Sequence, residues 1–90
     1  MHELPTQLVI TKHAYKRYRE RVGSLSRKVL YQRIGTALHC GLYSYGEGAV
    51  KFYGIWWGCM TDQRGTVLTT CYGRQDEDMI ARRRRHETDA

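Results

Sequence analysis

The sequence predicts a single α+β domain in which an N-terminal strand and two helices pack on a twisted antiparallel sheet. Apolar residues recur at helical spacing in the first half of the chain, whereas aromatic and β-branched residues dominate the second half. With 90 residues and 41% hydrophobic content, the chain has room for one hydrophobic core. The expected order is β-α-α-β-β-β over residues 1–75, followed by a charged tail at residues 76–90.

The first strand and the first helix are expected close to the N-terminus. Residues 4–10 predict a short strand that tolerates Pro5 near its start. Residues 12–22 follow with helical spacing, with Thr11 as the expected N-cap and Gly23 as the residue that ends the helix.

A second helix is expected over residues 27–40. Leu30, Ile34 and Leu38 recur every four residues and form an apolar stripe. Gly41 is expected at the position after the last helical residue, where glycine is common. The apolar stripe favours burial against a sheet, and it argues against this segment being the recognition helix of a DNA-binding regulator.

Three strands are expected in the second half of the chain, at residues 42–45, 49–60 and 66–72. A hairpin turn over residues 62–65 joins the last two. In the tail, residues 76–90, the acids precede the arginines, which is the order that a helix dipole favours. Few apolar residues are present to pack it, so the tail is expected either as a helix or as a frayed end.

A hairpin loop at Gln63 and Arg64 would divide the last strands into two faces. This register pairs Cys59 with Leu68, Trp57 with Thr70, and Ile55 with Tyr72. The face expected beneath the helices is mostly apolar and holds Val50, Phe52, Gly54, Trp56, Gly58, Met60, Val67, Thr69 and Cys71. The face expected to be open mixes cations, hydroxyls and aromatics and holds Lys51, Tyr53, Ile55, Trp57, Thr70, Tyr72 and Arg74.

The net charge of +6 is concentrated in the first third of the chain. Residues 1–33 hold eight Lys and Arg against two acids, whereas the remainder is balanced. A basic patch of this kind is typical of proteins that bind nucleic acid, because each phosphate contact releases counterions. An acidic protein partner would suit the same patch.

Composition argues against several other classes of protein. The three cysteines are odd in number and form no C-x-x-C pair, which argues against a zinc cluster or a disulfide framework and for a reducing cytoplasm. The four histidines are scattered, so neither a metal nor a cofactor is expected. No apolar run is long enough to span a membrane, and the first residues do not form a signal peptide.

The segment ITKHAYKR at residues 10–17 resembles the motif I-[ST]-x-H-A-x-x-R, which opens the first helix of small phage- and plasmid-borne ribonuclease toxins. The closing strand VLTTCYGR at residues 67–74 is also similar to the final strand of these proteins. The chain therefore resembles the RelE-like toxins and their wider group of barnase-, EndoU-, colicin- and RelE-like nucleases. The element order extends this resemblance over nearly the whole chain, but the specific motif covers only about a dozen residues.

The resemblance implies a metal-independent endoribonuclease, either a toxin or a phage-encoded factor that modifies its host. RNA would be cleaved by attack of the 2′-OH on phosphate, with ribosome-bound mRNA as one candidate substrate. The candidate catalytic residues are His13, Lys51, Tyr72 and Arg74. The candidate RNA-binding residues are Lys16, Arg17, Arg21, Tyr53, Trp57 and Thr70. An acidic antitoxin or a host protein is the implied second partner.

A non-enzymatic interpretation of the same residues stays open. His13 is equally suited to hydrogen-bond a neighbouring loop, and Arg17 and Arg21 to form a solvated face. The chain would then bind RNA, or inhibit a host nucleic-acid enzyme, through its basic face. If the first helix covers the core, His13 can reach Lys51 and Tyr72 only around an edge of the sheet.

Overall fold

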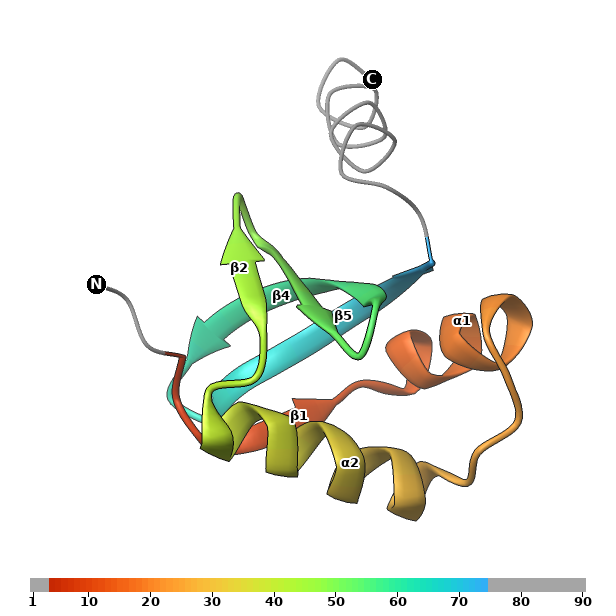
Figure 1. The fold of residues 1–90 in the computed structure, drawn as a ribbon, viewed down its shortest axis with the longest axis horizontal. Coiled ribbons are helices and arrows are strands. Elements are labelled where there is room, and N and C mark those ends of the chain that lie inside the picture. Colours follow the sequence, from red (N-terminus) through yellow and green to blue (C-terminus); the bar gives the residue numbers. More distant parts are fainter. Residues whose placement is uncertain (1–3, 75–90) are drawn as a thin grey trace.

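Both helices pack on one face of a five-stranded sheet in the computed structural model, which describes residues 4–74 (Figure 1). The elements in chain order are β1 (Leu8–Ile10), α1 (Lys12–Arg21), α2 (Arg27–Cys40), β2 (Ser44–Gly46), β3 (Ala49–Phe52), β4 (Ile55–Asp62) and β5 (Gly65–Gly73). The predicted α+β class is confirmed. The tail expected at residues 76–90 lies outside the described residues.

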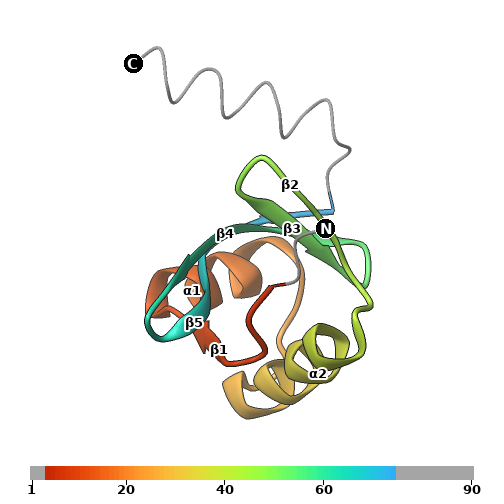
Figure 2. The same ribbon diagram turned by 90° about the vertical axis from the view of Figure 1, so that its left-hand side faces the viewer.

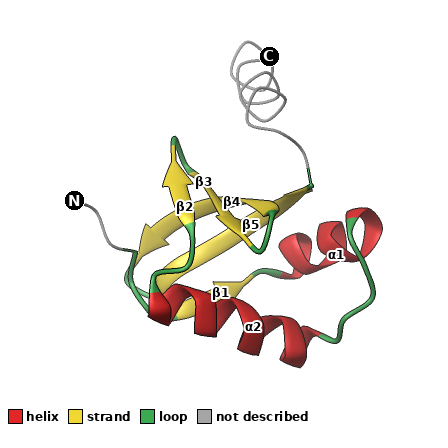
Figure 3. Cartoon of the chain, in the orientation of Figure 1, coloured by secondary structure: helices red, strands yellow, loops and turns green. Residues whose placement is uncertain are grey.

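The strands lie in the order β1-β5-β4-β3-β2 (Figure 3). β1 runs parallel to β5, while the other neighbouring strands are antiparallel. The sheet is therefore mixed, and the prediction of an antiparallel sheet is wrong at this edge. A residue pattern does not fix the direction of a strand relative to one that lies far along the chain.

Side chains and glycine at the helix ends determine where α1 and α2 begin and end. Thr11 and Ser26 have extended backbones, and their hydroxyl oxygens accept hydrogen bonds from the N–H groups of Ala14 and Val29. α2 ends at Gly41, whose φ of 71° lies in the left-handed region that glycine adopts readily. The predicted roles of Thr11 and Gly41 are confirmed.

A two-residue turn interrupts the long strand expected over residues 49–60. Tyr53 and Gly54 have φ values of 52° and 79°, and Phe52 pairs with Ile55 across the turn. Two left-handed residues in succession are typical of a type I′ hairpin turn, which favours Asn-Gly rather than Tyr-Gly. The turn adds one strand, so the predicted order β-α-α-β-β-β is wrong.

The β3–β4 turn and register shifts in the β4–β5 pair decide which side chains of β4 and β5 enter the core. The predicted pairing of Cys59 with Leu68 is confirmed, but Trp57 lies opposite Cys71 rather than Thr70. The register shifts at two places along β4, and each shift leaves one extra residue in β5. The faces predicted for β4 are wrong because the turn places Ile55 opposite Phe52 and Trp57 opposite Val50, so Ile55 and Trp57 share the inner face.

Trp57 therefore points into the core and is 0% exposed. Its ring stacks on Tyr18 of α1, with ring centroids 5.7 Å apart and an angle of 8° between the planes. The prediction that Trp57 stacks an RNA base on an open face is wrong. Ile55 also belongs to the core, while Trp56 lies on the face of the sheet away from the helices, called here the outer face. Met60, expected in the core, is 48% exposed.

The main core lies between the helices and the inner face of the sheet. Figure 2 shows both helices on the same side of the curved sheet. The helices contribute one buried stripe each, made of Ala14, Tyr18, Leu30, Ile34, Ala37 and Leu38. The stripe predicted for α2 is therefore confirmed as buried. Within residues 4–74, neither helix has the length and apolar character needed to cross a membrane.

The start of β5 touches the N-terminal segment closely. The N–H of Thr66 donates to the carbonyl oxygen of Gln7 at 2.8 Å, and its hydroxyl donates to the carbonyl oxygen of Pro5 at 2.6 Å. Gly65 has a φ of 117°, and a Cβ added there would lie 2.4 Å from the carbonyl oxygen of Gln7. Both the backbone conformation and the available space therefore require glycine at this position.

Gly65→Ala is expected to lower the free energy of unfolding by roughly 2 kcal/mol or more, because backbone strain adds to a clash with Gln7. Gly46→Ala is the matched control in a strand, since a Cβ at Gly46 would meet no atom within 4 Å. Urea unfolding measures both variants. Equal unfolding midpoints for the two would contradict the close β1–β5 approach.

Candidate nucleic-acid interface

Positive charge is concentrated on the two helices. α1 carries five Lys and Arg against one acid, and α2 carries three cations and no acid. The helices therefore supply +7 of the net +8 carried by residues 4–74. Because both helices lie on the same side of the sheet, one face of the protein has a strongly positive potential.

An open hollow on the surface of α1 gathers three of these cations. Its volume is about 400 Å³, and it is lined by Lys12, Tyr15, Lys16, Arg19 and Glu20. Positions three and four apart share one face of a helix, which is why these side chains meet. Lys16 is one of the predicted RNA-binding residues. Sequence reasoning missed Lys12 and Arg19, although the same helical spacing identifies both.

Tyr15 has a fixed position in this hollow. Its hydroxyl donates to the carbonyl oxygen of Leu25 at 2.9 Å, which ties α1 to the segment before α2. The guanidinium carbon of Arg19 lies 6.0 Å from the centroid of the Tyr15 ring, within the range of a cation–π contact. The ring therefore helps to position one of the cations of the hollow.

The acid in the hollow is paired with a neighbouring arginine. Arg17 donates to Oε2 of Glu20 at 2.7 Å, and this hydrogen bond holds the pKa of Glu20 below its usual value. Glu20 is therefore ionised at neutral pH and attracts Arg17. An RNA contact by Arg17, as predicted, has to compete with this exposed ion pair.

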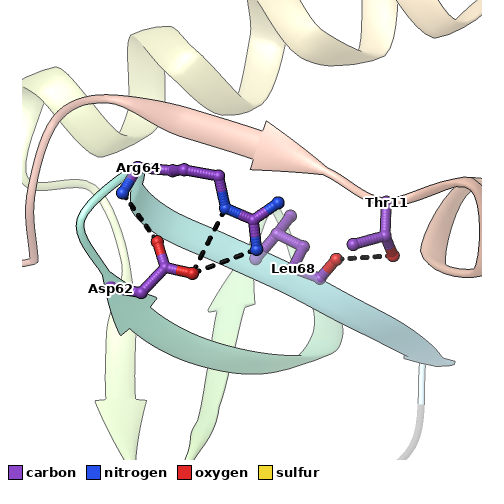
Figure 4. A network of polar contacts seen from close by, with 4 residues as sticks. All are labelled: Thr11, Asp62, Arg64 and Leu68. Carbon is purple, nitrogen blue, oxygen red and sulfur yellow. Dashed lines mark hydrogen bonds and ion pairs between the residues drawn. The ribbon is translucent and has the colours of Figure 1, made fainter.

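Arg21, another predicted RNA-binding residue, donates to the sheet instead. Its Nη1 lies 2.7 Å from the carbonyl oxygen of Cys71. At the other end of α1, the hydroxyl of Thr11 donates to the carbonyl oxygen of Leu68 at 2.9 Å (Figure 4). β1 pairs with β5 only as far as Leu68, so Thr11 bonds the last residue of the paired part and Arg21 bonds the edge beyond it, which no described strand covers.

Lys51 and Tyr72, both predicted as catalytic, share the outer face of the sheet. Lys51 lies opposite Trp56 in the register, with its Nζ 5.5 Å from the centroid of the Trp56 ring. Tyr72 belongs to a small buried cluster with Trp56 and Ala49. Sequence reasoning placed Trp56 in the main core. Recognising Gly54 as part of a turn would have placed Trp56 opposite Lys51.

His13 lies apart from this group. It is exposed in the first turn of α1, on the helical side of the sheet. Lys51 lies in β3, two strands from β5, so about 10 Å of sheet separates it from the strand on which α1 packs. His13 and Lys51 therefore lie on opposite sides of the sheet, and the structure does not bring them together.

The other predicted site residues lie at separate places. Thr70 is half-buried beside Gly58, where a Cβ would lie 2.9 Å from the Thr70 methyl group. Arg74 is exposed directly after β5. Tyr53 is 56% exposed at the β3–β4 turn, and its hydroxyl donates to the carbonyl oxygen of Arg33 in α2 at 3.2 Å.

The thiols and potential metal ligands of residues 4–74 are buried or dispersed. Burial raises the pKa of both Cys59 and Cys71 to about 11, so neither is a thiolate nucleophile at neutral pH. This part of the chain contains no group of three His, Cys, Asp or Glu side chains that could hold a metal ion. Cys40 is the exposed thiol of this part of the chain, and it lies at the last residue of α2.

No protein-family model, curated protein or solved structure matches the chain. The resemblance to RelE-like ribonucleases therefore stays a prediction that rests on residues 10–17 and 67–74.

Arg21→Ala is expected to lower the free energy of unfolding by about 1–3 kcal/mol, because it leaves the carbonyl oxygen of Cys71 without its donor. Lys16→Ala, on the exposed surface of the same helix, is the control. It should change the free energy of unfolding by less than about 0.5 kcal/mol. Urea unfolding of both variants measures the difference. An unchanged free energy of unfolding in Arg21→Ala would mean that the guanidinium does not support the edge of β5.

Proposed function

We propose that the protein binds RNA through the positively charged face formed by its two helices. The observation that carries this proposal is the segregation of charge, since the helices supply nearly all of the net charge of residues 4–74. Cations gathered on one face favour phosphate binding, because each contact releases condensed counterions. The hollow of α1 is where three of these cations line one cavity.

The hollow suits a phosphate of the RNA backbone. Lys12 and Lys16 supply mobile ammonium groups, and Arg19 supplies a planar guanidinium that can donate two parallel hydrogen bonds. Glu20 repels a bound phosphate only weakly, because its negative charge is paired with Arg17. The resemblance of residues 10–17 to a ribonuclease motif favours RNA over DNA.

Replacing Lys12, Lys16 and Arg19 together by Gln is expected to weaken the binding of single-stranded RNA and to reduce its salt dependence. Each phosphate contact contributes about 0.7 to the slope of log K against log salt concentration, so the slope should fall by about 2. Fluorescence anisotropy with a labelled oligoribonucleotide at several salt concentrations measures both quantities.

Arg64→Gln is the matched control for this triple variant. Arg64 lies at the β4–β5 turn, where its Nη2 is 3.0 Å from Oδ2 of Asp62 (Figure 4). This variant removes a cation that lies away from the helices, so the affinity for RNA should change by less than about twofold. An unchanged slope in the triple variant would contradict the proposal. Capture of an acidic protein but not RNA by the same face would assign the patch to an antitoxin or host protein.

Metal-independent endoribonuclease activity is the second function that we propose, because Lys51 and Tyr72 lie on either side of Trp56 on the outer face. Attack of the 2′-OH on phosphate requires proton transfer and cations that neutralise the phosphorane oxygens. In this proposal Lys51 and Arg74 neutralise the phosphate and Tyr72 positions it, while solvent water accepts the proton of the 2′-OH and protonates the 5′-oxygen as its bond to phosphorus breaks. His13 has no part in the reaction, since it lies on the other side of the sheet.

Cleavage of this kind should persist in EDTA and leave 2′,3′-cyclic phosphate ends on the RNA. Lys51→Ala is expected to reduce the rate by about 10²- to 10³-fold through the loss of charge stabilisation, whereas His13→Ala should cleave at the wild-type rate. End-group analysis of labelled RNA measures both. Loss of cleavage in His13→Ala would contradict the assignment to the outer face, and no cleavage by the wild type at several pH values would exclude the nuclease.

A further inference from the structure

Tyr53 occupies a backbone position that disfavours its side chain. It is the first residue of the β3–β4 turn, with a φ of 52°, and Gly54 follows with a φ of 79°. Type I′ turns favour Asn, Asp or Gly at this position, because a bulky residue in the left-handed region is strained. Residues held in such conformations cluster at ligand-binding and other functional sites.

The side chain of Tyr53 is held at its hydroxyl end, although more than half of the residue is exposed. Its hydroxyl donates to the carbonyl oxygen of Arg33 at 3.2 Å, while the residue as a whole is 56% exposed. A Cβ placed on Gly54 would meet no atom within 4 Å, so the turn beside the ring is open. The ring therefore has a fixed anchor and a surface that a ligand can reach.

The part of α2 next to Tyr53 combines cationic and apolar side chains. Arg33, whose carbonyl oxygen accepts the hydrogen bond, is exposed, and Val29 one turn earlier is 37% exposed. α2 contains no acidic residue that would repel a phosphate. An aromatic ring beside a cation is the combination that binds single-stranded nucleic acid, since the ring stacks a base and the cation holds the backbone.

We propose that Tyr53 stacks an unpaired base, and that the RNA bound by the helical face is therefore single-stranded at this point. This inference rests on the RNA binding proposed above and names the class of RNA. The base stacks on the exposed ring of Tyr53, and Arg33 binds a phosphate of the same strand. Bases within a duplex are already stacked on one another, so a duplex does not use the ring.

Tyr53→Asn tests this proposal with a residue that type I′ turns favour, so the variant should fold at least as stably as the wild type. It is titrated with a labelled single-stranded oligoribonucleotide and with a duplex of the same length. We expect single-strand affinity to fall by about 5- to 150-fold, the usual range for the loss of one stacked base. Duplex affinity and the salt slope should not change, because no charge is removed.

Tyr45→Thr is the matched control, since Tyr45 is a second exposed tyrosine, 44% exposed in β2. It should bind both RNAs like the wild type. Tyr53→Trp gives a direct readout, because it places an indole at the exposed turn while Trp56 and Trp57 are buried. The single strand should bind this variant and quench its fluorescence, and the duplex should not quench it.

Unchanged single-strand affinity in Tyr53→Asn, or no quenching in Tyr53→Trp, would overturn the inference. If the triple variant of Lys12, Lys16 and Arg19 loses RNA while Tyr53→Asn retains it, the inference fails and the proposed RNA binding stands. No binding of either RNA by the wild type would overturn both.

Discussion

The two-residue turn at Tyr53 and Gly54, together with the register shifts between β4 and β5, determines which side chains of the last three strands form the core and which form the surface. Each shift leaves one extra residue in β5 and exchanges the faces of the side chains that follow. Because the turn places Ile55 opposite Phe52, Trp57 packs on Tyr18 beneath the helices and Trp56 lies with Lys51 on the outer face. The shifts in β5 then place Cys71 in the core and Tyr72 beside Trp56. With a regular β4–β5 ladder, Cys71 would leave the core and Tyr72 would turn toward the helices, so the outer face would lose Tyr72.

Elements governed by local rules could be predicted from the sequence. The α+β class, the cap at Thr11, the buried stripe of α2 and its end at Gly41 all follow from spacing and from residue type. The strands depend on contacts that no local pattern contains. Tyr53 gives no turn signal of the Asn-Gly kind, and the parallel direction of β1 is fixed only by its pairing with β5. The shifts in β5 likewise arise from pairing between strands.

The candidate site could be predicted only in part, for the same reason. The charge on α1 follows from composition, and the place of Lys16 in the hollow follows from helical spacing. Arg21 shows the limit of that spacing, because a helical pattern places its backbone but not the end of a long side chain, which reaches the carbonyl oxygen of Cys71. The turn at Gly54 places Trp56 opposite Lys51. Because the sequence contains no signal for this turn, the contact between Lys51 and Trp56 could not be predicted either.

Thr11 fastens α1 to β5 where its pairing with β1 ends, and Arg21 fastens the helix to the part of β5 that β1 leaves unpaired. A strand edge left open would offer its N–H and C=O groups to strands of other copies, which is a common route to aggregation. α1 therefore protects the fold against self-association, and the same helix carries the cationic hollow. One ten-residue helix thus both covers the edge of β5 and presents the cationic hollow, and Arg21 on its sheet side is tied to the fold while Lys12 and Lys16 on its outer side are exposed.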